Sequence, residues 1–342
     1  MYLVSVLVPV YKVGRYIERC ARSLFEQTYS NLEYVFVDDC SPDNSVEVLE
    51  RIMNDYPARK DTVRIVRHDH NRGLAASRNT GLDNAAGAFI LCVDSDDWLE
   101  INTIESLVHN QQEKDADIVT GGYLVHCDEG KTILRTPKAF KDKEQMVLQM
   151  MQHTWDHFVA GRLVRRSLFI DNGLCWKEGF DVAEDRYMMS LLAYYAQKYD
   201  SVDDIVYHYE RGNLNALTKA SDGKRVFRNN HQELGNLLFL EQFFRDKEIV
   251  YQKECSRCIV EQLENNLRAA VYYSSKDEYN HVVSIIDGRD KVELELIGWT
   301  RNGMKGWMKH HYVSSLLSHR IDKTIRFIKK RAKAVFCTDR IQ

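Results

Sequence analysis

Apolar residues in the first hundred positions form short runs that alternate with segments of helical spacing. The runs are LVSVLVPVY, LEYVFVDD, TVRIVRHD and GAFILCVD, and the helix-like segments between them cover residues 14–27, 45–56 and 74–85. Short apolar strands separated by helices of about ten residues are typical of βαβ units, whose parallel sheet is covered on both faces. The pattern therefore predicts an α/β fold with a Rossmann-like, mainly parallel sheet flanked by helices.

The pattern changes farther along the chain. Between residues 100 and 220 strand-like and helix-like segments mix, and the helical segment AEDRYMMSLLAYYAQK opens with two acids. After about residue 225 helical spacing dominates, apart from one candidate strand, KVELELIGW; the polar stretch TKASDGKR separates the two regions. We therefore expect a first domain over residues 1–225 and a mostly helical C-terminal region over residues 226–342.

Composition narrows the class of protein. The 342 residues are 44% apolar and 28% charged, with a net charge of -3, as in a folded globular protein. No apolar run reaches the ~18–20 residues that cross a bilayer, and the N-terminus lacks the basic leader of a signal peptide. The eight cysteines are scattered along the chain. These features predict a cytoplasmic protein with reduced thiols.

The C-terminal segment is strongly basic. From residue 301 onward Asp322 and Asp339 are the only acids among many lysines and arginines. In RIDKTIRFIKKRAKAVF apolar residues recur every three or four positions, which predicts a cationic amphipathic helix. Such a helix either lies on an anionic membrane surface, as a peripheral contact with the inner face of the cell membrane, or packs against the protein. No pattern typical of nucleic-acid binding accompanies it, so no nucleic-acid partner is expected.

Acids gather at the ends of two predicted strands. Asp38 and Asp39 end the second strand, and Asp94, Asp96 and Asp97 follow the fourth. Because ligands of such sheets bind outside the carboxyl ends of the strands, both clusters should face one crevice. Neighbouring carboxylates repel each other unless a cation lies among them, and oxygen ligands favour Mg²⁺, Mn²⁺ or Ca²⁺ over zinc. The clusters predict metal and diphosphate binding; the alternative is that Asp96 or Asp97 only caps the next helix.

Three blocks in this order resemble the family 2 inverting glycosyltransferases, which have the nucleotide-sugar-binding GT-A fold. They are VSVLVPVYKVGRYIERCARSLFEQTYSNLEYVFVDDCSPDNS, NRGLAASRNTGLDNAAGAFILCVDSDDWLE and AEDRYM. The likeness is close through residue 100 and looser to about residue 220. It implies metal-dependent transfer of a hexosyl or N-acetylhexosaminyl group from a nucleotide-diphosphate sugar to a hydroxyl of a saccharide or lipid-linked saccharide. The expected setting is the synthesis of a cell-surface polysaccharide or other glycoconjugate.

The resemblance also implies a role for each matching residue. Asp39 would accept the imide proton of a uracil ring, which favours UDP-sugars. The other expected contacts with the donor nucleotide are Pro9, Val10, Tyr11, Arg78, Asp94 and Ser95. Asp96 would be the main ligand of Mn²⁺ or Mg²⁺, with Asp97 as a substitute.

The acids of AEDRYM supply the expected general base. The acceptor hydroxyl must lose its proton as it attacks, while the metal stabilises charge on the leaving diphosphate. By resemblance Asp185 is the base and Glu184 its neighbour, in contact with the acceptor. Farther along, VYHYERGNLNALT resembles the family's tyrosine-rich strand and loop, which implies a diphosphate contact from His208 or Arg211.

Two other functions fit parts of the sequence. A nucleotidyltransferase that makes sugar nucleotides typically has a glycine-rich N-terminal loop, whereas VPVYKVGRY contains only Gly14. A non-catalytic nucleotide-binding domain or a receiver-type signalling domain shares the acidic strand end VFVDD, but leaves DSDD and AED without a role. The glycosyltransferase hypothesis accounts for all three blocks.

Overall fold

The computed structural model describes residues 1–287 except 128–129, 138, 153–156, 214–215, 218, 220–221 and 274. The chain divides into two compact units, Met1–Lys219 and Ala220–Gln342. The predicted strand KVELELIGW and the predicted basic helix both lie outside the described residues. None of the helices in the described part of the chain has the length and apolar character of a membrane span.

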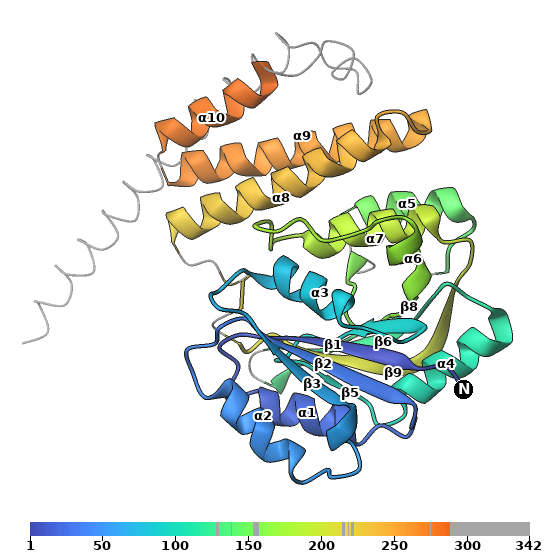
Figure 1. Ribbon diagram of the computed structural model, residues 1–342. Coiled ribbons are helices and arrows are strands. Elements are labelled where there is room, and N and C mark those ends of the chain that lie inside the picture. Colours follow the sequence, from blue (N-terminus) through green and yellow to red (C-terminus); the bar gives the residue numbers. More distant parts are fainter. Residues whose placement is uncertain are drawn as a thin grey trace, which may run out of the picture. The chain divides into compact units, whose positions relative to one another are not determined.

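One nine-stranded sheet forms the centre of the first unit (Figure 1). In chain order the strands are β1 (Val4–Val10), β2 (Leu32–Asp38), β3 (Val63–Arg67), β4 (Phe89–Cys92), β5 (Trp98–Leu99), β6 (Ile118–His126), β7 (Thr132–Arg135), β8 (Leu163–Arg165) and β9 (Tyr199–Glu210). Across the sheet the order is β3-β2-β1-β4-β8-β6-β9-β5, and β7 pairs with β6.

The first four strands pair in parallel, as the sequence predicts. Strand β1 lies between β2 and β4, with Val10 opposite Asp38 and Leu7 opposite Cys92, so the carboxyl ends of these strands are neighbours. Beyond β4 the sheet is mixed: β8 runs antiparallel to β4 and β6, and β6 runs parallel to β9. The predicted α/β class is confirmed, and the acids at the ends of β2 and β4 lie at the same edge of the sheet.

Helices lie on both faces of the sheet, with α1 and α2 on one side and α3 on the other (Figure 1). The helices of the first unit are α1 (Ile17–Phe25), α2 (Ser45–Met53), α3 (Leu74–Asp83), α4 (Thr103–Lys114), α5 (Lys143–Met151), α6 (Arg166–Asp171) and α7 (Glu184–Tyr195); a short 3-10 turn, Lys60–Thr62, precedes β3. Helices α3 and α7 matter most here, because each carries buried charged residues that pair with one another next to the end of β4.

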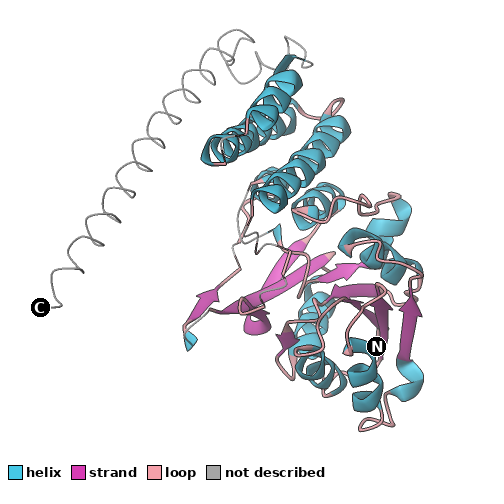
Figure 2. Ribbon diagram, turned by 90° about the vertical axis from the view of Figure 1, so that its left-hand side faces the viewer, coloured by secondary structure: helices cyan, strands magenta, loops and turns pink. Residues whose placement is uncertain are grey.

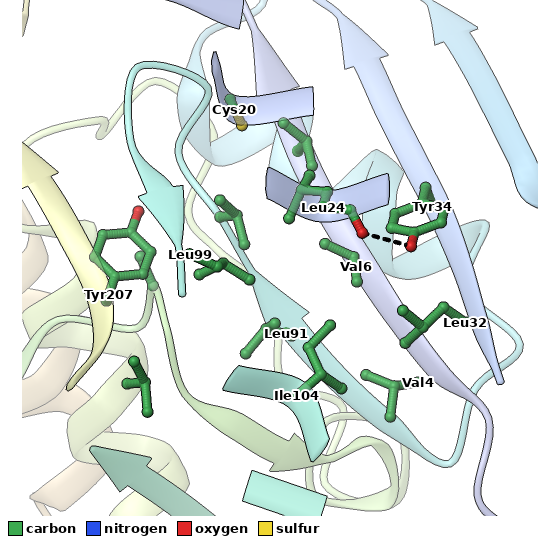
Figure 3. Close-up of a cluster of buried hydrophobic side chains, with 14 of the residues drawn as sticks. Val4, Val6, Cys20, Leu24, Leu32, Tyr34, Leu91, Leu99, Ile104 and Tyr207 are labelled. Atoms are coloured by element: carbon green, nitrogen blue, oxygen red, sulfur yellow. Dashed lines mark hydrogen bonds between the residues drawn. The ribbon is translucent and has the colours of Figure 1, made fainter. Parts of the chain in front are cut away.

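Helix α1 shows how the core is built. Its buried residues recur every three or four positions: Ile17, Cys20, Ala21, Leu24 and Phe25. They join Val6, Tyr34 and Leu91 of the strands in one hydrophobic cluster (Figure 3). The Tyr34 hydroxyl satisfies its polarity by donating to the carbonyl oxygen of Leu24 at 2.7 Å. Burying each large apolar side chain contributes about 1.5–3 kcal/mol, so this face holds α1 firmly on the sheet.

The described part of the second unit is helical, as predicted. It consists of α8 (Gly223–Phe244), α9 (Ile249–Tyr272) and α10 (Lys276–Asp287). Helices α8 and α9 pack side by side, and α9 also contacts α10 (labelled in Figure 1; helices are cyan in Figure 2). The Asp222 side chain begins α8 by accepting the backbone N–H of Arg225 at 2.9 Å.

Candidate active site at the carboxyl ends of the strands

The loops that follow β1 and β2 are hydrogen-bonded to each other. The backbone N–H of Lys12 donates to Ser41 Oγ at 2.9 Å, and that of Gly14 donates to Asp43 Oδ2 at 3.0 Å. A Cβ atom at residue 14 would approach the side chain of Asn44 closely, so a larger residue there would require Asn44 to move. The two loops therefore lie together at the carboxyl ends of β1 and β2.

The three residues expected beside the nucleotide base differ in exposure. Val10 is buried in the core, Pro9 is half-buried, and Tyr11 is 39% exposed. The Tyr11 ring also lies 4.9 Å from the ammonium of Lys12. Tyr11 is thus the member of this group with a side chain that offers substantial surface to a ligand.

Asp39 accepts four hydrogen bonds from the segment that follows β3. Its Oδ1 accepts from His68 Nδ1 at 2.7 Å and from the N–H of Arg72 at 2.8 Å; its Oδ2 accepts from Asn71 Nδ2 and the N–H of Gly73, both at 2.8 Å. A carboxylate has about four acceptor positions, so these donors use its capacity. The structure gives Asp39 the role of ordering this segment. The expected bond to a uracil ring would have to displace one of these donors.

Asp39→Asn should therefore destabilise the fold. The amide nitrogen of asparagine cannot accept, which leaves two partly buried donors without their acceptor. At ~1–3 kcal/mol for each, we expect a loss of about 3 kcal/mol in the free energy of unfolding, measured in urea. Asp69→Asn, at a side chain that is 87% exposed, is the control. Superimposable curves for Asp39→Asn and wild type would contradict this role.

Helix α3 begins against a carboxylate from a distant segment. Gly73, just before the helix, has φ of 94°, and a Cβ atom there would collide with the carboxylate of Asp181. Asp181 Oδ1 accepts the N–H of Ala75 at 2.9 Å. A carboxylate in this position satisfies a free helical amide and interacts favourably with the helix dipole. The start of α3 is thus fixed to the chain that leads into α7.

Arg78 of α3 joins three carboxylates. Its side chain is 1% exposed; Nη1 donates to Glu184 Oε1 and Asp185 Oδ1, each at 2.6 Å, and Nη2 donates to Asp94 Oδ1 at 2.9 Å. From its sequence context, this arginine is expected to contact the nucleotide or its phosphates. The structure places it between the end of β4 and the start of α7. One guanidinium thus brings the expected base together with an acid of the expected metal turn.

Burial and repulsion shift the ionisation of the two acids that begin α7. Burial, followed by the neighbouring Asp185, raises the pKa of Glu184 to about 8, although Arg78 opposes the shift. Burial likewise raises the pKa of Asp185, again against the effect of Arg78. The pair therefore tends to retain a proton near neutral pH. A carboxylate with a raised pKa is the better general base, because its affinity for the transferred proton is higher.

The turn that follows β4 offers oxygen ligands to a cation. The side chain of Asp94 is 28% exposed, Ser95 is buried, and Asp96 is partly exposed, with its Oδ2 accepting from Asn213 Nδ2 at 2.8 Å. Burial and the charge of Asp94 raise the pKa of Asp96 to about 6. Among the described residues no group of three or more His, Cys, Asp or Glu side chains forms a ready metal site. Because Mg²⁺ and Mn²⁺ often use one or two carboxylates, with water and phosphate completing the shell, Asp96 beside Asp94 fits such an ion.

Asp97 lies differently from the other acids of this turn. It is 1% exposed, and its oxygens accept from the Tyr207 hydroxyl at 2.6 Å and the N–H of Glu210 at 2.7 Å. Each oxygen therefore accepts a hydrogen bond inside the protein. The expectation that Asp97 substitutes as a metal ligand is not supported, because its carboxylate faces β9.

His208 and Arg211, near the end of β9, have different surroundings. Side chains alternate along a strand, so His208 lies on the opposite face of β9 from Tyr207. Its ring stacks on Trp98, with 4.8 Å between centroids, and Nε2 lies 2.7 Å from Glu100 Oε1. The structure therefore does not bring His208 to the turn after β4. Arg211 is exposed just after β9 and stays the candidate for a diphosphate contact.

Three residues of the site were missed by sequence reasoning. They are Asp181 at the start of α3, and Tyr207 and Asn213, which hold the turn after β4. The tyrosine-rich strand VYHYE indicates that a tyrosine lies near the site. Its sequence does not show whether Tyr207 or Tyr209 is the residue that bonds the turn. Asp181 and Asn213 stand in irregular polar segments, where no periodicity marks a partner.

Known proteins match the chain in sequence. Residues 5–173 match the family model described as "Glycosyl transferase family 2". EpsJ of Bacillus subtilis (strain 168), named an uncharacterized glycosyltransferase, is 32% identical over 225 residues, which cover 64% of this chain and 63% of EpsJ. The chain thus spans less than two thirds of the length of this curated relative.

Solved structures share the fold. TarS 1–349 of S. aureus, in complex with UDP-GlcNAc, matches with a TM-score of 0.63 at 20% identity, covering 93% of this chain and 89% of that one. The mannosyltransferase PcManGT from Pyrobaculum calidifontis, in complex with GDP-Man and Mn²⁺, matches with a TM-score of 0.52 at 18% identity, covering 94% and 88%. At these identities the likeness establishes the fold alone, which confirms the predicted GT-A class.

Proposed function

Because this chain belongs to glycosyl transferase family 2, we propose that it transfers a sugar from a nucleotide-diphosphate donor to a hydroxyl acceptor, with inversion at the anomeric carbon. The observation that carries the proposal is the junction at Arg78, whose guanidinium bonds Asp94, Glu184 and Asp185. It unites the acidic end of β4, suited to a divalent cation that binds a diphosphate, with a carboxylate suited to proton abstraction.

A UDP-sugar is the donor that we favour. TarS is solved with UDP-GlcNAc, which supports a uridine nucleotide, whereas PcManGT is solved with GDP-Man. The acceptor in this proposal is a saccharide or lipid-linked saccharide that grows into a cell-surface glycan. Tyr11 and Arg211, both exposed beside the crevice, are the side chains proposed to contact the nucleotide and its phosphates.

Asp96, with Asp94 beside it, would hold Mn²⁺ or Mg²⁺. When bound, the ion stabilises the negative charge that develops on the leaving diphosphate. The proposal draws support from the hard oxygen donors of this turn and from the Mn²⁺ in the PcManGT complex. Asp97 is not included, since both of its oxygens are used by β9.

Asp185 acts as the general base in this proposal. As the acceptor oxygen bonds to the anomeric carbon, the bond from that carbon to the diphosphate oxygen breaks, and the hydroxyl proton passes to Asp185. Attack from the face opposite the leaving group inverts the configuration. Arg78 keeps the Asp185 carboxylate oriented and favours its charged form. Glu184, bonded to the same guanidinium, is proposed to contact the acceptor.

Ligand-dependent melting tests the donor and metal proposals together. UDP with Mn²⁺ should raise the melting temperature by about 5 °C near saturation, more than the sum of the two separate shifts. GDP and dTDP should give smaller shifts. Asp96→Asn should lose the synergy, whereas Asp55→Asn, at an exposed pair with Arg22, should keep it. Equal stabilisation by UDP with and without the ion would argue against the metal.

A further inference from the structure

Strand β9 backs the turn between residues 94 and 97. The Tyr207 hydroxyl accepts the N–H of Asp94 at 3.1 Å and donates to Asp97 Oδ2 at 2.6 Å. The N–H of Glu210 donates to Asp97 Oδ1 at 2.7 Å, and the N–H of Asp97 closes the turn on the Asp94 carbonyl at 3.0 Å. Tyr207 and Asp97 are buried, so water does not compete for these bonds. One hydroxyl thus fixes both ends of the turn.

Asp96 is held from two other directions. Its Oδ2 accepts from Asn213 Nδ2 at 2.8 Å, and its carbonyl oxygen accepts from Arg19 Nη2 at 3.2 Å. Arg19 also pairs with Glu210 at 3.0 Å, and its guanidinium lies 3.5 Å from the centre of the Trp98 ring. Of the two carboxylate oxygens, Asn213 thus engages Oδ2. Oδ1 is the carboxylate oxygen that does not bond Asn213.

We propose that Tyr207 is a positioning residue for the divalent ion, acting through Asp97 and the backbone of Asp94 without touching ion or substrate. The inference rests on the proposed metal at Asp96. Asp96 lies between the two points that Tyr207 fixes, so its carboxylate direction depends on them. Loss of the hydroxyl would leave Asp97 Oδ2 and the N–H of Asp94 without their partner, and the turn would shift to find new ones. Groups behind metal ligands commonly change metal affinity by ~10–100-fold when removed.

The test is a Mn²⁺ titration of wild type and variants in the presence of UDP, with free Mn²⁺ followed by electron paramagnetic resonance. Tyr207→Phe should weaken Mn²⁺ binding about tenfold and leave UDP binding without metal unchanged. Tyr34→Phe is the matched control, because it also removes a buried hydroxyl, one that donates to Leu24 far from this turn in the fold. It should bind Mn²⁺ as wild type does.

A second variant keeps the test independent of how Tyr207→Phe folds. Asp97→Asn should weaken Mn²⁺ binding to a similar degree as Tyr207→Phe, whereas Asp96→Asn should abolish it. If Asp97→Asn abolishes binding too, Asp97 is a ligand and the inference is overturned. It is overturned as well if Tyr207→Phe stays within about twofold of wild type, or if Tyr34→Phe has an equal effect. Failure of wild type itself to bind Mn²⁺ with UDP would instead overturn the proposed metal dependence.

Discussion

Asp185→Asn should lower the rate of sugar transfer by about 10²–10⁴-fold and leave donor binding unchanged, because asparagine keeps the shape but cannot take the acceptor's proton. Its carbonyl oxygen can still accept from Arg78, so the site should stay assembled. The measurement is release of nucleoside diphosphate in the presence of acceptor, with donor binding followed separately by calorimetry.

Glu184→Gln is the matched control for this variant. It removes a charge from the same guanidinium at the adjacent residue, with the same change of acid to amide. We expect a smaller fall in rate than for Asp185→Asn. If Glu184→Gln loses more activity than Asp185→Asn, Glu184 is the base and the two assignments are exchanged.

The pH dependence of kcat/KM for wild type is a second test of Asp185 as the general base. Asp185 must be ionised to accept a proton, so kcat/KM should rise with pH. Because burial raises the pKa of Asp185, the acid limb should lie above the ordinary aspartate value of 3.8. An acid limb at or below that value would contradict the role of Asp185.

Arg78→Met should reduce the free energy of unfolding by about 3–5 kcal/mol, the range typical when one partner of a buried ion pair is removed. The substitution keeps an unbranched side chain in the same space but removes the guanidinium that Asp94, Glu184 and Asp185 share. The three carboxylates would then face each other without it. Urea unfolding without ligands measures the loss.

The loss in Arg78→Met should depend on pH. The folded-state pKa of Glu184 is already about 8, above its ordinary 4.5, and it should rise further once Arg78 is gone. When the pKa of a carboxyl is higher in the folded state than in the unfolded state, its contribution to stability is complete below the unfolded-state pKa. That contribution is lost as the pH rises through the folded-state pKa. The difference in the free energy of unfolding between Arg78→Met and wild type should thus be smallest near pH 4.5 and largest above pH 8.

Arg67→Met provides the comparison for Arg78→Met. Arg67 forms an exposed pair with Glu50, and exposed pairs contribute only about 0–1 kcal/mol. Arg67→Met should therefore change the free energy of unfolding only slightly across the same pH range. A loss for Arg78→Met that is equally small, or that does not change with pH, would mean that the buried acids do not depend on the arginine.

Local pattern was enough to predict the strands whose ends carry the acids. Alternation of apolar runs and helical segments predicted β1 to β4 and their parallel direction, since a helical segment separates each strand from the next. The acids at the ends of β2 and β4 follow directly from that topology. The position of Asp185 at the start of α7 was equally visible, because the helix begins where its apolar spacing begins.

The partners of those acids could not be predicted, because these pairs join residues that are far apart in the sequence and meet only in the folded structure. Arg78 lies in a helical segment whose sequence gives no sign that it meets Glu184 and Asp185, 106 and 107 positions later. The same limit applies to Asp97: its residue type fits a metal ligand, and only the packing of β9 shows that Tyr207 already uses its oxygen. The hydrogen bonds of Asp39 could not be predicted for a related reason, since its four donors come from a segment without periodicity.

The long separations within the site also bear on how a nascent chain matures on the ribosome. Asp94 meets Tyr207 113 positions later, and Asp96 meets Asn213 117 positions later. Strands β1 to β4 can pair as they emerge, but Arg78 and the acids of the turn await the arrival of α7 and β9. Until then the half-built sheet exposes charged groups and an open edge at β4, the kind of species that chaperones bind and that aggregates when translation stalls.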